Sequence, residues 1–240
     1  MIPKLDICFT PALFPFYFDE NRETIAIVVD VFRASTTICY AFSSGVKSIR
    51  PVASIEDAIE AKNQGFLVGA ERNTEKCSFA DFGNSPFDYS PEKVHGKEIV
   101  FTTTNGTKTI EAVSTASRVL IGAFSNISSI ADYCLSKDCD VIVCCAGWNN
   151  RINLEDSLFA AAFCEILLSK RQYNANSDAL LIALKIWNEA KCDLRAYLEA
   201  SEHVQRLLRL GLDKDINFSL MRDTTKIIPI YRKSTGKLEL

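Results

Sequence analysis

Ile25-Ala-Ile-Val-Val29 and Val141-Ile-Val-Cys-Cys145 decide the fold class of this chain. Both runs are apolar at every position instead of alternating, which is typical of parallel strands covered on both faces. Segments of helical periodicity separate these and the other apolar runs. The segment that follows Ser54 is the clearest, because it has a serine cap, acids in its first turn and a stop at Gly65. The pattern predicts a layered α/β fold whose sheet is largely parallel, with helices on both faces.

The same patterns extend over the whole chain. Strands are predicted at 24–30, 47–52, 66–70, 98–104, 118–124, 140–147 and 226–231, and helices at 33–44, 54–64, 106–116, 126–137, 154–170, 177–190 and 193–210. Residues 71–97 have no clean period, and an irregular stretch of that length is usually functional or a small subdomain. Nothing marks a domain boundary, so we expect residues 1–240 to form a single compact α/β unit.

The composition argues against some classes of partner and indicates the cellular compartment. The 240 residues carry 27 Lys+Arg against 30 Asp+Glu, a net charge of −3, which argues against a nucleic-acid partner. No uncharged apolar run reaches the roughly 18 residues of a membrane span. The nine cysteines include no C-x-x-C pair, as expected for free thiols in a reducing compartment. We therefore expect a cytoplasmic protein without a membrane or nucleic-acid partner; the sequence leaves a homo-oligomer open.

Polar residues gather where the predicted strands end. Ligands of open parallel sheets bind beyond the carboxyl ends of the strands, near helix N-termini. Hydroxyl and arginine side chains there are suited to phosphate, and carboxylates are the ligands that Mg²⁺ prefers. The residues of this kind are Asp30, Arg33, Ser35, Thr36, Glu71, Arg72, Thr102–Thr104, Asn105, Gly106, Thr107, Glu155 and Asp156. The sequence therefore predicts a phosphate and hard-metal site.

Other interpretations of these residues stay open. Each residue taken singly is explained as well by a turn, a cap or a strand preference. Cys144 allows a cysteine-dependent amidohydrolase, although its apolar strand position favours a packed thiol. A non-catalytic anion-binding module is a further alternative. The phosphate-binding P-loop, the dinucleotide fingerprint and the G-x-S-x-G elbow are all absent from the sequence.

Six short motifs occur along the chain in a recognisable order. They are Val29-Asp-Val-Phe-Arg-Ala-Ser-Thr-Thr-Ile38, Glu71-Arg72, Asp81-Phe-Gly-Asn-Ser-Pro86, Thr102-Thr-Thr-Asn-Gly-Thr107, Cys145-Ala-Gly147 with Leu154-Glu-Asp156, and Ser201-Glu-His203. In this order the chain resembles the 2-phosphosulfolactate phosphatase family from about residue 5 to 235. The resemblance implies a Mg²⁺-dependent phosphatase that converts 2-phospho-3-sulfolactate to 3-sulfolactate and phosphate in coenzyme M biosynthesis. Another small anionic phosphomonoester is the alternative substrate.

The residues and the resemblance together yield a set of predicted roles. The catalytic candidates are Asp30, Glu155, Asp156 and His203. The candidate metal ligands are Asp30, Glu71 and Asp156, and the sequence does not separate a ligand role of Asp30 from a nucleophile. The candidate substrate-binding residues are Arg33, Ser35, Thr36, Arg72, Asn84, Ser85, Thr103, Thr104, Asn105, Gly106 and Thr107.

The chain departs from the family pattern at a few positions. After Glu71-Arg72 the family usually has a glycine pair, whereas this chain has Asn73-Thr74. Residue 204, after His203, is valine where the family tends to have glycine. These departures concern the substrate more than the phosphatase chemistry.

Overall fold

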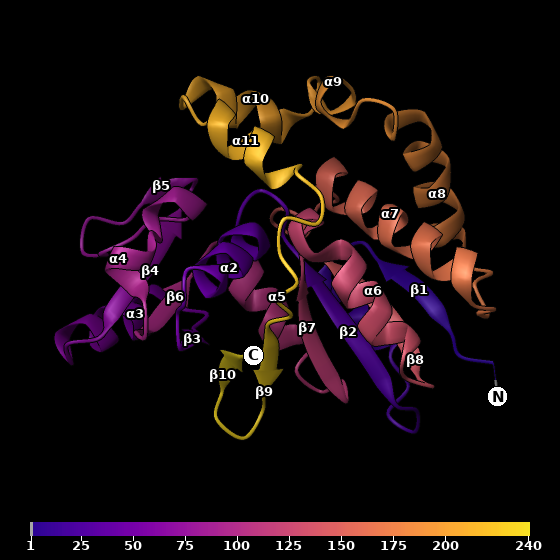
Figure 1. Cartoon of the computed structure of the whole chain (residues 1–240), viewed down its shortest axis with the longest axis horizontal. Helices are drawn as coiled ribbons and strands as arrows, with labels where there is room; N and C mark the ends of the chain where they lie inside the picture. The colour runs from indigo at the N-terminus through magenta and orange to yellow at the C-terminus, as the bar shows by residue number, and fades with distance from the viewer. Residues whose placement is uncertain (1) are drawn as a thin grey trace.

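The long apolar runs form the centre of a parallel half-sheet. The computed structural model describes residues 2–240 (Figure 1). The strands of this half-sheet are β1 (Leu5–Cys8), β2 (Thr24–Val29), β7 (Arg118–Gly122) and β8 (Asp140–Cys145). They lie in the order β1-β8-β2-β7, every pairing is parallel, and every residue of β2 is buried. Complete burial explains why this strand carries no polar alternation.

A second half-sheet is joined to the first by the C-terminal hairpin. It contains β3 (Ser48–Pro51), β6 (Glu98–Thr102), β4 (Leu67–Arg72) and the short antiparallel β5 (Glu75–Lys76). The hairpin of β9 (Ile230–Arg232) and β10 (Lys237–Glu239) lies between the halves, so the described residues form one ten-stranded sheet (Figure 1). The pairs β7–β9, β9–β10 and β10–β3 are all antiparallel. The parallel strands of one half therefore point in the direction opposite to those of the other half.

Helices cover both faces of the first half-sheet, which confirms the predicted fold class. Alternate residues of β2 enter different cores, because successive side chains of a strand point to opposite faces. Ile25, Ile27 and Val29 pack in the core that contains α6 (Ile127–Leu135), α7 (Leu154–Lys170) and α8 (Asp178–Ala190). Ala26 and Val28 pack in the core of α2 (Ala34–Ser43) and α5 (Gly106–Ala112), which also includes apolar residues of β3 and β6. The helix α3 (Ile55–Asn63) contributes to a smaller core with β4 and β6.

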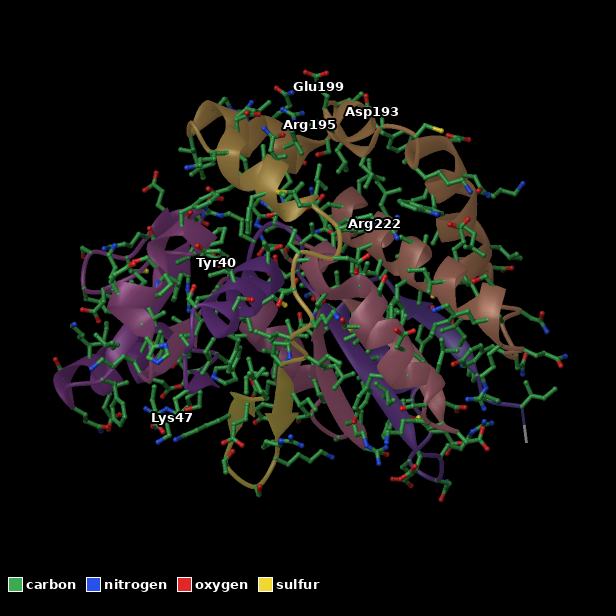
Figure 2. The ribbon with its side chains drawn as sticks, viewed as in Figure 1. Tyr40, Lys47, Asp193, Arg195, Glu199 and Arg222 are labelled. Atoms are coloured by element: carbon green, nitrogen blue, oxygen red, sulfur yellow. The ribbon has the colours of Figure 1, made fainter. Side chains whose placement is uncertain are left out.

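Three short C-terminal helices arch over the sheet (Figure 1). They are α9 (Leu194–Leu198), α10 (Glu202–Arg209) and α11 (Asp213–Ser219). The predicted helix 193–210 is wrong as a single element, since Asp193 caps α9 and Ser201 caps α10 with separate side-chain hydrogen bonds. Arg195 of α9, labelled in Figure 2, forms an ion pair of 2.9 Å with Asp213 of α11. Arg222, also labelled, lies over the ring of Trp187 in α8.

Most predicted elements are present with shifted ends. The strand predicted at 226–231 begins only at Ile230, and β1 and α11 were not predicted. The irregular region 71–97 contains the end of β4, the strand β5 and two helical turns. The short helical segments of the chain are Pro11–Leu13, α1 (Phe14–Tyr17), Pro86–Asp88, α4 (Pro91–Val94) and Phe124–Asn126.

The helix α7 runs through the larger core over 17 residues. Residues 158–164 are all buried, so the helix is enclosed by protein on every side along this stretch. Within residues 2–240, no helix combines the length and the apolar character that crossing a membrane requires.

The hairpin supplies the first prediction. Leu238 is fully buried, pairs with Ile49 of β3 and Tyr231 of β9, and belongs to the core that contains α2. Leu238→Ala should lower the free energy of unfolding in urea by about 2–5 kcal/mol, because it leaves a cavity at the junction of the half-sheets. The control is Leu240→Ala, whose side chain is exposed and whose cost should stay below about 0.5 kcal/mol. Equal costs for both variants would show that the hairpin does not hold the sheet together.

Candidate active site

One cavity collects most of the predicted site residues. Its lining is polar, and it combines carboxylates, an arginine, a histidine, hydroxyls and amides with two aromatic rings. The lining residues are Asp30, Phe32, Arg33, Glu71, Thr74, Asn84, Thr104, Asn105, Gly147, Trp148 and His203. The helical arch contributes His203 from α10, and the remaining residues follow or end strands or lie in the irregular region 71–97.

Both half-sheets supply residues to this cavity. Asp30 and Gly147 follow β2 and β8 of one half, whereas Glu71 belongs to β4 and Thr104 follows β6 of the other. Because the halves run in opposite senses along the sheet, their carboxyl ends do not share one edge of a flat sheet. Residues that follow strands of both halves nevertheless line the same cavity. The prediction of one shared edge is therefore corrected to two edges, one from each half-sheet, that meet at the cavity.

The backbone of Asp30 is fixed by Ser35. The Ser35 hydroxyl donates to the Asp30 carbonyl at 2.7 Å and accepts from the Asp30 N–H at 2.9 Å. Gly106 lets α5 begin directly against the carboxylate, since a Cβ at that position would lie 2.9 Å from Asp30 Oδ2 and 2.7 Å from Ala34 Cβ. A side chain at position 106 would therefore displace the carboxylate or the start of α2.

Burial makes Asp30 a weaker acid than an ordinary aspartate. Desolvation raises the pKa of Asp30 to about 6; the negative charges of Glu71 and Glu155 add to the rise, and His203 opposes it. A cavity with this balance of charge favours a proton or a cation beside Asp30.

Glu71 is held by the loop that follows its strand. Its Oε1 accepts from the Thr74 N–H at 2.5 Å and from the Thr104 hydroxyl at 3.2 Å. The loop needs left-handed backbone, with φ of 54° at Asn73 and 78° at Thr74. Glycine adopts such angles without strain, which explains a glycine pair in the family pattern, whereas a β-branched threonine is strained there. The strain coincides with the cavity wall, as is common at functional sites.

Arg33 is paired with a residue that the sequence analysis did not single out. Its Nη1 lies 2.8 Å from Asp215 Oδ2 of α11, and both side chains are almost fully buried. Its Nη2 donates to the Thr74 carbonyl at 2.8 Å, and Ser85 donates to the other Asp215 oxygen at 3.1 Å. Asp215 therefore offsets the charge of Arg33, so that this arginine adds little net positive charge to the cavity.

His203 faces the cavity with a carboxylate behind it. Its Nδ1 lies 2.5 Å from Oε1 of Glu155, which is fully buried in the first turn of α7. A carboxylate at Nδ1 keeps the proton on that nitrogen and leaves Nε2 for a ligand or for proton transfer. The ring also meets the edge of Phe32, with ring centres 6.0 Å apart. These contacts fix both the position and the tautomer of the imidazole.

Asp156 lies behind the cavity and does not line it. Its oxygens accept from the N–H groups of Val31 at 2.8 Å and Gly147 at 3.2 Å, so it ties the ends of β2 and β8 together. Burial, followed by the charges of Asp30 and Glu155, raises the pKa of Asp156 well above its ordinary value. Asp156 therefore positions the loops that follow β2 and β8.

Two of the three predicted metal ligands meet at the cavity. Asp30 and Glu71 both line it. Among residues 2–240, no group of three or more His, Cys, Asp or Glu side chains is placed to hold a metal ion by itself. Magnesium is commonly bound by one or two carboxylates together with substrate phosphate and water, so a pair of carboxylates is compatible with this ion. The raised pKa of Asp30 also indicates that a cation is favourable there.

The other predicted binding residues divide into two groups. Asn84, Thr104 and Asn105 line the cavity. The remaining candidates support the loops around it through hydrogen bonds or close packing: Ser35, Thr36, Arg72, Ser85, Thr103, Gly106 and Thr107. The cavity also contains Phe32, Thr74 and Trp148, which had no predicted role. Phe32 lies inside a quoted motif, but Trp148 had only its place after Gly147 as a signal.

Cys144 is in the wrong environment for a nucleophile. It is fully buried on β8, beside Cys8 of β1, within the core that contains α2. A hydrogen bond with Cys8 and burial raise the pKa of the Cys144 thiol well above its ordinary value. A nucleophilic cysteine needs the opposite shift and access to substrate. The structure therefore argues against the cysteine-dependent amidohydrolase.

One cavity of this α/β fold thus combines carboxylates, hydroxyls and a histidine that is held by a carboxylate. Such a combination is typical of hydrolases that act on small anionic substrates. Residues 8–234 match the family described as 2-phosphosulpholactate phosphatase, and the chain belongs to that family.

Similar proteins carry the corresponding name. A protein of Thermotoga petrophila, named "Probable 2-phosphosulfolactate phosphatase", is 37% identical over 85% of this chain and 87% of its own length. Proteins with the same name from Caldanaerobacter subterraneus and Gloeothece citriformis are 36% and 30% identical. The former match covers 88% of each chain, and the latter covers 96% of this chain and 97% of the relative. The similarity therefore extends over the whole fold described above.

The acidity of Asp30 predicts how its replacement changes stability. Between pH 4 and pH 6 the folded protein keeps a proton that the unfolded chain has released, so rising pH destabilises the folded state through Asp30 by about 3 kcal/mol. Asp30→Asn removes this cost. In EDTA, the variant should gain about 1–3 kcal/mol over the wild type at pH 8, and the gain should shrink as the pH falls to 4.

Urea unfolding at both pH values measures the effect. Asp132→Asn, in the exposed ion pair with Lys170, should change stability by less than about 0.5 kcal/mol at either pH. A loss of stability at pH 8 in Asp30→Asn would mean that the ionised carboxylate is well solvated or paired.

Proposed function

We propose that this protein hydrolyses 2-phospho-3-sulfolactate to 3-sulfolactate and inorganic phosphate. Family membership and the names of the relatives support the reaction class. The observation that carries the proposal is the convergence of Asp30, Glu71 and His203 with the Thr104–Asn105 loop at one cavity. The alternative is another small anionic phosphomonoester, which the same groups would also accept.

Asp30 and Glu71 would hold Mg²⁺ in this proposal. Two carboxylates alone repel a phosphate, whereas the same carboxylates with a divalent cation attract it. When bound, the ion supplies Lewis-acid neutralisation of the charge that develops on the phosphate oxygens. Thr104 orients Glu71 through its hydroxyl, and Asn105 accepts from the Asn149 N–H at 3.2 Å, which links the two loops beside the phosphate.

His203 is the proposed proton carrier. Hydrolysis of a phosphomonoester needs proton transfer at the attacking water or the leaving oxygen, and histidine is the residue most often used. Glu155 holds the Nδ1 side of the ring, so proton transfer takes place at Nε2, and Glu155 acts as a positioning residue. Phe32 and Trp148 provide apolar walls that limit the access of bulk water to this nitrogen.

The place of the reaction in the cell follows from the proposed substrate. We infer a cytoplasmic enzyme of coenzyme M biosynthesis, whose partner is a small anionic phosphomonoester. All nine cysteines are free thiols, and seven of them are buried, which is the usage expected in a reducing compartment.

A phosphate-release assay tests the proposed function. The purified protein should release inorganic phosphate from 2-phosphosulfolactate, EDTA should abolish the release, and Mg²⁺ or Mn²⁺ should restore it. Full activity in a metal-free preparation would contradict the magnesium assignment. Binding of the ester without release would favour the non-catalytic anion-binding module, and release only from other phosphomonoesters would identify a different substrate.

A further inference from the structure

A second cavity adjoins the site at Trp148 and His203, which line both. The site cavity has a volume of only about 30 Å³, whereas the second has about 230 Å³. Its other lining residues are Arg151, Ile152, Asn153, Leu154, Glu155, Ser201, Glu202 and Arg206. A cavity of about 300 Å³ adjoins the site at Thr104 and Asn105 as well, so a ligand bound at Asp30 and Glu71 can extend in either of two directions.

Trp148 lies between the two cavities at the start of a closed backbone turn. The backbone N–H of Trp148 donates to the Arg151 carbonyl, and the backbone N–H of Arg151 donates to the Trp148 carbonyl, each at 2.9 Å. The two residues between them, Asn149 and Asn150, have φ of 51° and 60°. Positive φ at both central positions is the geometry of a tight hairpin turn, in which asparagine is favoured. The indole is thus presented by a closed turn.

Arg206 of α10 lies on this indole with its charge unpaired. Its guanidinium carbon is 4.0 Å from the centre of the Trp148 ring. Within residues 2–240, no carboxylate lies within ion-pair distance of Arg206, and its Nε is buried without a hydrogen-bond partner. Asn153 Oδ1 and Glu155 Oε2, from the same lining, are likewise buried without partners. A cavity with several unpartnered polar atoms is suited to a polar ligand with water.

The remaining charges of this cavity leave Arg206 available. Glu155 is engaged with His203 through its other oxygen, and Glu202 forms no ion pair with Arg206 in the described chain. Arg151 is exposed at the cavity wall and adds a second positive charge. By contrast, Arg33 is already neutralised by Asp215, and Arg72 does not line the site cavity. The cavity beyond Trp148 therefore offers two arginines to a ligand, Arg151 and the stacked Arg206, whereas the cavity at Thr104 and Asn105 offers one exposed lysine, Lys108.

We propose that Arg206, stacked on Trp148, binds the second anionic group of the substrate, a sulfonate or carboxylate, while the phosphate occupies the Asp30–Glu71 cavity. This inference rests on the proposed function. An arginine fork matches the planar or trigonal oxygens of either group with two donors, and stacking holds the fork in place before the ligand arrives. Arg206 is then a specificity residue that does not touch the reacting phosphorus.

The test compares three esters in wild type, Arg206→Gln and Arg209→Gln. The esters are 2-phosphosulfolactate, 2-phospholactate without the sulfonate, and 1-sulfopropan-2-yl phosphate without the carboxylate. Arg206→Gln should raise KM for 2-phosphosulfolactate about ten- to a hundredfold, the effect of losing one charge-assisted contact, with kcat much less changed. Arg209, exposed on the same helix, is the matched control and should stay within twofold of wild type. An ester that is not turned over is measured as a competitive inhibitor instead.

The three esters separate the outcomes. For the ester that lacks the group bound by Arg206, wild type and Arg206→Gln should have the same KM or inhibition constant, which identifies the group as sulfonate or carboxylate. An unchanged KM, or an equal loss with all three esters, would overturn the inference while leaving the phosphatase intact. If the wild type releases no phosphate from 2-phosphosulfolactate, the proposed function fails and this inference fails with it. Unchanged thermal unfolding of Arg206→Gln shows that the effect is on binding.

Discussion

A carboxylate enclosed with two other acids is the constraint on which this site depends. Asp30 is 91% removed from solvent, and Glu71 and Glu155 both raise its pKa. An arrangement of that kind costs stability in the absence of a proton or cation, and the fold retains it by securing each acid separately. Glu71 is bonded by the loop after β4, Glu155 by His203, and Asp156 by two backbone N–H groups. The negative charge that faces the cavity, and that a cation could neutralise, is concentrated on Asp30 and Glu71.

The architecture follows from the need to bring these groups together. Neither half-sheet holds the site alone, because Asp30 and Glu71 belong to different halves joined by the C-terminal hairpin. The helical arch completes it from above, with His203 on α10 and Asp215 on α11. Tyr40 of α2, labelled in Figure 2, packs edge-on against Phe218 of α11 at 5.4 Å between ring centres. The arch is therefore attached to the central helix α2 as well as to the site.

The sequence predicted local structure well and long-range pairing poorly. Continuously apolar strands identified β2 and β8, and the strand-end residues Asp30, Glu71 and Thr104 do meet at the cavity. Asp215 could not be found in this way, because its pairing with Arg33 spans 182 positions and depends on how α11 folds back. The hairpin was also missed in part, since β9 and β10 have three residues each and carry almost no periodic signal. Asp156 was predicted from its type and position, which do not reveal that backbone N–H groups already occupy its oxygens.

The central claim is that phosphate release takes place at the cavity around Asp30. The most direct test is the kcat of Asp30→Asn with 2-phosphosulfolactate at saturating Mg²⁺, beside Asp132→Asn as a surface control. Asparagine is nearly isosteric and preserves the loop, but it lacks the charge that the site requires. The account predicts that kcat falls at least about a hundredfold in Asp30→Asn, with the fold retained and the surface control at the wild-type rate. A near-wild-type kcat in Asp30→Asn would contradict it and place the chemistry elsewhere.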